Sequence, residues 1–323
     1  MFTRTLGRSG IEVSAMGLGC WAIGGPYTNP EGNPCGWGKV DDAESIRAIH
    51  RAMDLGVTLF DTAACYGAGH SERVLGEALK GRRDKVVIAT KFWHRFDEDA
   101  REVLGSYESP DEIPAACEDS LRRLQTDHID LYQFHQGNYD PAKADAVRDA
   151  CEKLVAQGKI RYYGWSTDDP ERARVFATGE HCTAIQQRLN LFEGNHETLR
   201  LCERENLASL NRTPLYKGLL SGKFSHDSTF PADDVRHPHW DLKQGKEAQD
   251  LERFQAIRDV LASDGRTPVQ GALGWLWGLS DKTIPIPGFK TIQQVEENAG
   301  AMEFGPLSQE QMKQIDELLA SAR

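Results

Sequence analysis

The sequence predicts an α/β protein that folds as a single (β/α)8 TIM barrel with a short N-terminal hairpin. Two observations predict this class. Eight short apolar runs alternate with amphipathic stretches, which is the pattern of strands that return through helices and lie parallel in one sheet. The length of 323 residues is enough for one such barrel, and no linker-like segment divides it. We therefore expect one domain over residues 1–323.

Local signals place the individual elements. The turn residues 6–10 predict the hairpin, Asp42 and Ser71 are suitable helix N-caps, and Gly56 and Gly158 stand where helices should end. The expected strands are 15–18, 58–60, 86–89, 129–134, 162–165, 184–187, 207–210 and 283–285, and the expected helices include 42–55, 71–79, 113–124, 142–157, 170–178 and 197–205.

A long irregular segment at 225–246 interrupts this alternation. It is polar and contains Pro231 and Pro238. Long loops in compact domains usually serve a function. In a barrel this one would follow the seventh strand, so we expect it over the active-site face.

Composition excludes several classes of protein. Lys and Arg number 38 against 49 Asp and Glu, and the resulting net charge of -11 argues against a nucleic-acid partner. No apolar stretch reaches the roughly 20 residues of a membrane span. The seven cysteines are scattered without a CxxC pair, which indicates reduced thiols, a cytoplasmic location and no metal site.

Four polar side chains lie where three consecutive strands should end. Asp61, Lys91 and His135 each follow a predicted strand, and Tyr66 lies in the short loop after Asp61. Barrel enzymes build their active sites at this end of the strands. Taken one at a time, each residue has a structural alternative: a helix cap, a surface charge, a core histidine or half-buried packing. Their coincidence at one end of the barrel favours a catalytic group.

The chemistry of these four groups fits proton transfer. A free tyrosine has a pKa of about 10. We expect the ammonium of Lys91 to bring the pKa of Tyr66 closer to neutral, and a carboxylate at Asp61 to hold that lysine in place. His135 could donate a hydrogen bond that orients a carbonyl oxygen. A hydride would have to come from a cofactor, because no side chain supplies one.

Several motifs, in order along nearly the whole chain, resemble those of the aldo-keto reductases. The sequence is most similar to the bacterial branch that includes general stress protein and pyridoxal reductase homologues and the relatives of the potassium-channel β-subunit. The matching segments are Phe60-Asp61-Thr62-Ala63, Tyr66-Gly67-Ala68-Gly69-His70-Ser71-Glu72, Asp130-Leu131-Tyr132-Gln133-Phe134-His135, Gly218-Leu219-Leu220-Ser221-Gly222-Lys223 and Ile284-Pro285-Ile286-Pro287-Gly288. The resemblance implies an oxidoreductase of aldehydes and ketones whose catalytic tetrad is Asp61, Tyr66, Lys91 and His135.

The resemblance also implies a nicotinamide cofactor. A positive charge at Lys290 would face a 2′-phosphate and favours NADPH over NADH. Thr167, Leu189 and Gln136 depart from the usual family residues, which leaves the substrate open. The implied cofactor-binding residues are Ser166 and Gln186 at the carboxamide, Arg212 over the nicotinamide, Leu215, Gly218, Leu219, Ser221 and Lys223 at the pyrophosphate, and Gly288, Lys290, Gln294, Glu297 and Asn298 around the adenosine phosphate and adenine.

Some alternatives remain open from the sequence. Trp37 and Trp93 are candidate walls of a pocket for a small carbonyl or sugar-like substrate, and core packing is their alternative. Lys91 could instead be the nucleophile of a Schiff-base aldolase. A cofactor-binding, redox-sensing subunit with slow turnover is a third possibility. The oligomeric state and the direction of the reaction are not determined.

Overall fold

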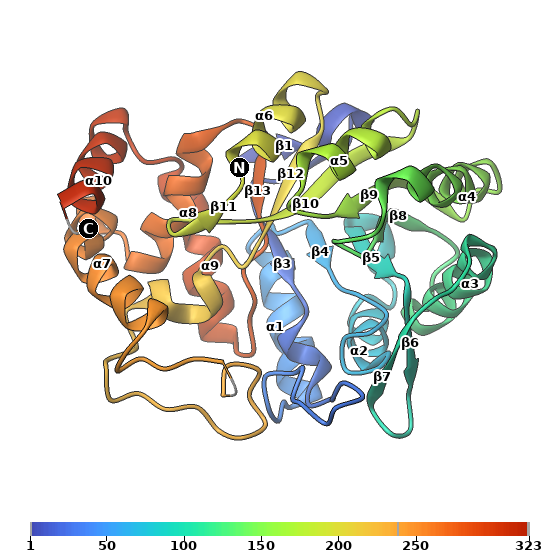
Figure 1. The fold of residues 1–323 in the computed structure, drawn as a ribbon, viewed down its shortest axis with the longest axis horizontal. Helices are drawn as coiled ribbons and strands as arrows, with labels where there is room; N and C mark the ends of the chain where they lie inside the picture. The colour runs from blue at the N-terminus through green and yellow to red at the C-terminus, as the bar shows by residue number, and fades with distance from the viewer. Residues whose placement is uncertain (1, 238, 322–323) are drawn as a thin grey trace.

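The computed structural model describes residues 2–237 and 239–321. Its centre is a parallel sheet that curves into the predicted barrel (Figure 1). All eight predicted strands are present, with ends shifted by a few residues. In their order around the sheet, the barrel strands are β13 (Thr283–Pro285), β12 (Ala208–Arg212), β10 (Cys182–Asn190), β9 (Ile160–Ser166), β8 (Ile129–Phe134), β5 (Val87–Phe92), β4 (Leu59–Asp61) and β3 (Gly17–Gly19).

The two edges of this sheet meet beside β3. A parallel bridge joins Gly19 to Gly288, and the Gly19 amide donates to the carbonyl of Pro287 at 2.9 Å. The opposite end of the barrel is covered by the predicted hairpin, β1 (Thr3–Thr5) and β2 (Glu12–Ser14). Between them lies the 3-10 turn η1 (Gly7–Ser9), where a Cβ on Gly7 would come within 2.1 Å of the Thr183 carbonyl.

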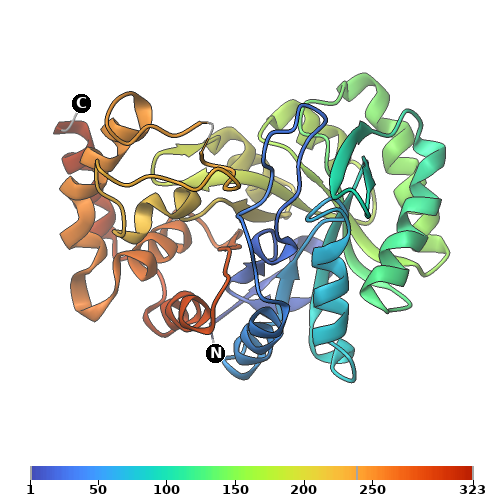
Figure 2. The ribbon, with the colours of Figure 1, turned by 90° about the horizontal axis from the view of Figure 1, so that it is seen from below.

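Helices surround the sheet, and Figure 2 shows them at its rim. The predicted helix ends are close, although the observed N-caps are Asp41 and Gly69 in place of Asp42 and Ser71. Gly56 and Gly158 do follow helix ends, with φ of 84° and 72°. The helices are α1 (Asp42–Asp54), α2 (His70–Ala78), α3 (Ile113–Leu124), α4 (Ala144–Ala156), α5 (Pro170–Ala177), α6 (His196–Arg204), α7 (Lys246–Leu261), α8 (Pro268–Leu279), α9 (Ile292–Phe304) and α10 (Gln309–Ser321).

The inside of the barrel changes from apolar to polar along each strand. Side chains two residues apart in a strand point to the same face. On this face Leu59 is followed by Asp61, and Ala89 by Lys91. The same step leads from Leu131 to Gln133 and from Ala184 to Gln186. The apolar members of these pairs belong to one buried cluster in the barrel. The polar members therefore collect at the carboxyl ends of the strands.

Two long connections extend from that end of the barrel (Figures 1 and 2). A hairpin of β6 (His94–Asp97) and β7 (Glu102–Ser106) follows β5 directly and was not predicted. The irregular segment 225–246 lies over this face, as expected: Asp234 forms a bridge with Trp37. Pro238 lies outside the described residues. Within the described part of the chain, no helix has the length and apolar character needed to cross a membrane.

Candidate active site

A buried ion pair lies at the centre of the polar end of the barrel. The Lys91 ammonium donates to Oδ1 of Asp61 at 2.5 Å and to the carbonyl of Thr62 at 2.7 Å. Lys91 is 1% exposed and Asp61 2%. Burial opposes the charge on Lys91, but Asp61 and the Tyr66 hydroxyl outweigh it and raise the pKa of the lysine above its usual value. The ammonium therefore stays charged and has little freedom to move.

Two buried amides hold the other oxygen of this carboxylate. Gln133 and Gln186 donate to Oδ2 of Asp61 at 2.9 and 2.8 Å, and Gln186 also donates to the side-chain oxygen of Gln133 at 3.1 Å. A buried carboxylate is stable when its lone pairs are paired in this way. Gln133 was not singled out from the sequence, although its two-residue spacing from buried Leu131 places it inside the barrel.

Tyr66 completes the group from the loop between β4 and α2. Its hydroxyl lies 3.3 Å from the Lys91 Nζ, and the ring stacks at 5.9 Å on Trp21, so the phenol group has a fixed position. The structure thus brings together Asp61, Tyr66 and Lys91, as the sequence predicts. His135 lies beside them, and its ring packs edge-on against Tyr66 at 6.0 Å.

One expectation about Tyr66 is wrong. Its pKa is raised to about 12 and not lowered toward neutral. Desolvation by the surrounding protein is the largest cause, and the charge of Lys91 opposes it only in part. The carboxylate of Asp61, which holds the lysine, also disfavours a phenolate nearby. Without a bound ligand the phenol is therefore held protonated, which is the form that donates a proton.

The loop that carries Tyr66 depends on a close backbone contact at Gly67. This residue has φ of 61°, and a Cβ on it would lie 2.0 Å from the carbonyl oxygen of Gly24. We predict that Gly67→Ala displaces Tyr66, lowers turnover and costs about 1–3 kcal/mol of unfolding free energy, measured by urea denaturation.

Gly81→Ala is the matched control for this prediction. Gly81 has φ of 71°, but nothing lies within 4 Å of the position that a Cβ would take. It should therefore show only the backbone cost of a left-handed alanine, about 1 kcal/mol, with turnover retained. Equal effects of the two substitutions would contradict the role assigned to the Gly24 contact.

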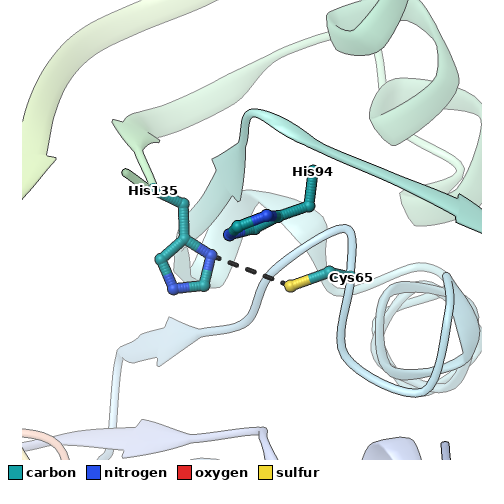
Figure 3. A group of neighbouring side chains, drawn as sticks. All are labelled: Cys65, His94 and His135. Atoms are coloured by element: carbon teal, nitrogen blue, oxygen red, sulfur yellow. Dashed lines mark hydrogen bonds between the residues drawn. The ribbon is translucent and has the colours of Figure 1, made fainter. Parts of the chain in front are cut away.

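His135 belongs to a small group of sulfur and imidazole side chains. Its Nδ1 lies 3.7 Å from the Cys65 sulfur, and its ring packs against His94 at 5.1 Å (Figure 3). Desolvation is the main reason that the pKa of His135 is well below its usual value, and His94 and Lys91 contribute. Burial also raises the pKa of the Cys65 thiol to about 12. At neutral pH the three groups carry no charge.

Aromatic side chains border the site on the side of the N-terminal loop. Trp37 packs edge-on against Trp21 at 5.1 Å, so the pair extends from Tyr66 toward the segment 225–246. Trp21 was not predicted. Trp93 has a different position: it is 2% exposed and packs against Phe134 at 4.8 Å. The structure therefore favours the core-packing alternative for Trp93, whereas Trp37 is partly exposed and stays a candidate wall.

Basic groups collect on the other side of this aromatic wall. Lys290 donates to the Trp37 carbonyl, and Arg236 lies 5.0 Å above the Trp37 ring and donates to the Lys217 carbonyl at 3.1 Å. Burial is the main cause of the lowered pKa values of Lys217 and Lys290, and the charge of Arg236 lowers both further. Asp234 pairs with Arg236 at 2.7 Å and partly offsets this effect at Lys290. The remaining positive charge in an acidic protein is a suitable lining for a phosphate-bearing ligand. Arg236 was missed because it lies in the irregular loop.

The other predicted cofactor residues lie at the end of β9, in and around η6, and in the loop before α9 and in α9 itself. Gly218 has a left-handed backbone (φ 94°) in η6 (Tyr216–Ser221), where Leu219 is fully buried, so only its backbone can face a ligand. Gln294 accepts from the Lys290 amide at 2.7 Å, and Asn298 donates to the Gly288 carbonyl at 3.3 Å. Ser166 ends β9, Leu215, Ser221 and Lys223 lie in or beside η6, and Glu297 lies in α9.

Arg212 is held by an ion pair beside a cavity. Its guanidinium donates to Asp168 at 2.6 Å, and both residues line a cavity of about 590 Å³ together with Thr167. Thr167, one of the departures from the family pattern, donates to the Gly137 carbonyl at 3.0 Å. This side of the site therefore has room beside Arg212 and a backbone-anchored threonine at its edge.

Comparison with known proteins identifies the class to which this fold and site belong. The model of the Aldo/keto reductase family matches residues 15–320. The chain therefore belongs to the aldo-keto reductase family and is an oxidoreductase. Among its relatives is the aldo-keto reductase YhdN of Bacillus subtilis, which is 34% identical over 295 residues, 89% of this chain and 85% of that protein.

Solved structures show the same architecture. The glycerol dehydrogenase of Gluconobacter oxydans matches with a TM-score of 0.85 and 32% identity, over 99% of this chain and 95% of that one. An aldo-keto reductase of Klebsiella pneumoniae in complex with NADPH matches with a TM-score of 0.70 and 28% identity, over 99% and 96% of the two chains. The family prediction and the barrel are thus confirmed.

Proposed function

We propose that this chain is an NADPH-dependent reductase of small aldehydes and ketones, or a dehydrogenase of the corresponding alcohols, with Tyr66 as the proton donor and acceptor. The observation that carries the proposal is the contact chain from Asp61 through the Lys91 ammonium to the Tyr66 hydroxyl, at 2.5 and 3.3 Å. This series of contacts ends at the partly exposed phenol of Tyr66, which lies beside an aromatic wall. Such a group is suited to protonate an oxygen atom in the pocket.

Each residue has a distinct part in this proposal. Bound NADPH would supply the hydride. Tyr66 donates its phenolic proton to the carbonyl oxygen as that oxygen becomes negative, and Lys91 stabilises the phenolate that remains. Asp61 keeps Lys91 in place. Neutral His135 orients the carbonyl oxygen by donating a hydrogen bond through Nε2, since Nδ1 faces the sulfur of Cys65.

The same geometry argues against the aldolase alternative. A Schiff base forms from an unprotonated amine, and enzymes that use one lower the pKa of the lysine. Here Asp61 raises the pKa of Lys91, and three oxygen atoms surround its ammonium. The redox-sensing alternative uses the same cofactor site and differs in rate, so a turnover measurement distinguishes it.

For the cofactor, the basic group of Lys217, Arg236 and Lys290 supports NADPH over NADH. We predict that Lys290→Met weakens NADPH binding about 10-fold or more, the equivalent of one charged hydrogen bond, and leaves NADH binding nearly unchanged. Titration of intrinsic tryptophan fluorescence measures both affinities. Lys313→Met, at a lysine exposed on α10, is the control for loss of a positive charge. Parallel loss of both cofactors in Lys290→Met would contradict the assignment.

For the substrate, we propose a small hydroxylated carbonyl compound, supported by the likeness to a glycerol dehydrogenase. The test is NADPH oxidation with glyceraldehyde, dihydroxyacetone and an apolar aldehyde of equal size, and NADP⁺ reduction with glycerol. Higher kcat/KM for the hydroxylated substrates supports the proposal, and preference for the apolar aldehyde would contradict it. We further propose a cytoplasmic location, which the seven free cysteines support.

A further inference from the structure

Three side chains that offer metal ligands converge at the edge of the catalytic group. Cys65 comes from the β4–α2 loop, His94 from the first position of β6, and His135 from the end of β8 (Figure 3). One ligand atom of each lies within 4.8 Å of the other two. The three residues are far apart in the sequence and come from three separate segments, so the absence of a CxxC pair did not bear on them.

Their geometry is close to that of a three-ligand zinc site. Zinc bonds of about 2.3 Å to sulfur and 2.0–2.1 Å to nitrogen, at tetrahedral angles, separate the two ligand atoms by roughly 3.6 Å. The Cys65 Sγ and the His135 Nδ1 are 3.7 Å apart. The third ligand atom lies within 4.8 Å, so a rotation that moves the His94 ring by ~1 Å would complete the set.

The surroundings admit a cation at this position. His94 and His135 are both partly exposed, whereas Cys65 is 6% exposed, so the set opens to solvent on its imidazole side. The nearest fixed positive charge, on Lys91, is already paired with Asp61 at 2.5 Å. A thiolate would bring the negative charge that a divalent ion needs. Thiolate with two imidazoles is a donor set that selects zinc and related borderline ions.

We propose that Cys65, His94 and His135 form a site for zinc or a similar thiophilic divalent cation, and that its occupation inhibits the enzyme. Binding forms one metal–sulfur and two metal–nitrogen bonds, and the thiol proton of Cys65 leaves to solvent. The fourth position of the metal is filled by water or by another small ligand from the pocket. The site is a feature of this chain's own loops and does not depend on the nicotinamide cofactor.

Inhibition rests on the function proposed above for His135. The metal holds the imidazole through Nδ1 and fixes the ring beside Cys65, where it already lies. The metal and its water then occupy the space beside Tyr66 in which a carbonyl oxygen would accept hydrogen bonds. Substrate reduction should therefore stop while NADPH still binds, because the basic group of Lys217, Arg236 and Lys290 lies beyond the Trp21–Trp37 wall.

The test adds Co²⁺ or Zn²⁺ alone to the metal-free, full-length protein. Cobalt bound by a thiolate absorbs in the near ultraviolet, and we expect this band to saturate at one equivalent in the wild type. Cys65→Ala should abolish the band, and His94→Gln should weaken zinc binding at least about 10-fold, measured by calorimetry. Circular dichroism and NADPH titration confirm that each variant is folded.

Matched controls remove a cysteine and a histidine outside the set. Cys35→Ala and His196→Gln, at a half-buried and an exposed position, should bind cobalt and zinc as the wild type does. Absence of a one-equivalent band in the wild type, or a band of wild-type strength in Cys65→Ala, would overturn the site. Zinc inhibition of equal strength in the wild type and Cys65→Ala would overturn its regulatory role.

The outcomes separate this inference from the proposed function. A cobalt band that requires Cys65, in a protein that reduces no carbonyl compound, would retain the metal site and refute the reductase. Carbonyl reduction without such a band would retain the reductase and refute the metal site. Where both are present, zinc should lower the rate of NADPH oxidation in the wild type, and a chelator should restore it.

Discussion

Replacing Tyr66 with Phe is expected to lower kcat for carbonyl reduction by about 10²–10⁴-fold, the usual contribution of a positioned general acid. The phenol is the group that the structure holds protonated, with its pKa raised to about 12, at 3.3 Å from the Lys91 ammonium. Phenylalanine keeps the ring that stacks on Trp21 and removes only the proton donor. NADPH affinity should therefore be retained. Steady-state NADPH oxidation and a fluorescence titration measure the two effects.

Tyr132→Phe provides the control for the loss of a buried tyrosine hydroxyl. Tyr132 lies in β8, and its hydroxyl is buried without a hydrogen-bond partner among the described residues. Removing it should leave kcat near the wild-type value, and the protein should be as stable or more stable, because no bond is lost. Activity of Tyr66→Phe equal to that of Tyr132→Phe would contradict the assignment of Tyr66.

Replacing Lys91 with Met is expected to cost about 3–5 kcal/mol of unfolding free energy as well as catalysis. The substitution removes an ammonium that is 1% exposed and leaves the Asp61 carboxylate buried without its countercharge. The pKa of Tyr66 would rise further, because the opposing charge of Lys91 is lost. Urea denaturation of the cofactor-free protein measures the stability.

The double variant Asp61→Asn/Lys91→Met separates charge from packing. With both charges removed, no uncompensated ion remains in the barrel, and most of the lost stability should return. Catalysis should not return, since nothing would stabilise the phenolate of Tyr66. If the double variant is as unstable as Lys91→Met, the cost arises from lost packing, and the account of the ion pair is wrong.

Much of the fold follows from local patterns, and the exceptions have identifiable causes. The barrel strands could be located because short apolar runs between turn signals fix them. The helical pattern did not single out α8, whose Trp275, Leu276 and Trp277 are all buried. A helix that packs on several sides lacks the polar face that marks an amphipathic helix. The β6–β7 hairpin is mostly polar and half exposed, so its sequence pattern predicts a loop.

The site was predictable where it depends on strand ends and not where it depends on loops. Asp61 and Lys91 lie at the carboxyl ends of β4 and β5, and His135 directly follows β8, so barrel topology brings them together. Arg236 lies in the segment 225–246, and His94 begins the β6–β7 hairpin outside the barrel strands. Only the folded structure shows that they face the site. The direction of the Tyr66 pKa shift could also not be predicted from the sequence. It depends on how far burial outweighs a nearby charge, and sequence gives no measure of that balance.

Transfer of deuterium from NADPH to a carbonyl carbon tests the central proposal most directly. NADPH carrying deuterium on the transferred position of C4 is mixed with glyceraldehyde and enzyme, and the alcohol product is examined by mass spectrometry. The account predicts one deuterium on the former carbonyl carbon with wild type, and labelled alcohol formed about 10²–10⁴-fold more slowly with Tyr66→Phe although cofactor is bound. Alcohol without deuterium, or labelled alcohol formed equally well by Tyr66→Phe, would contradict it.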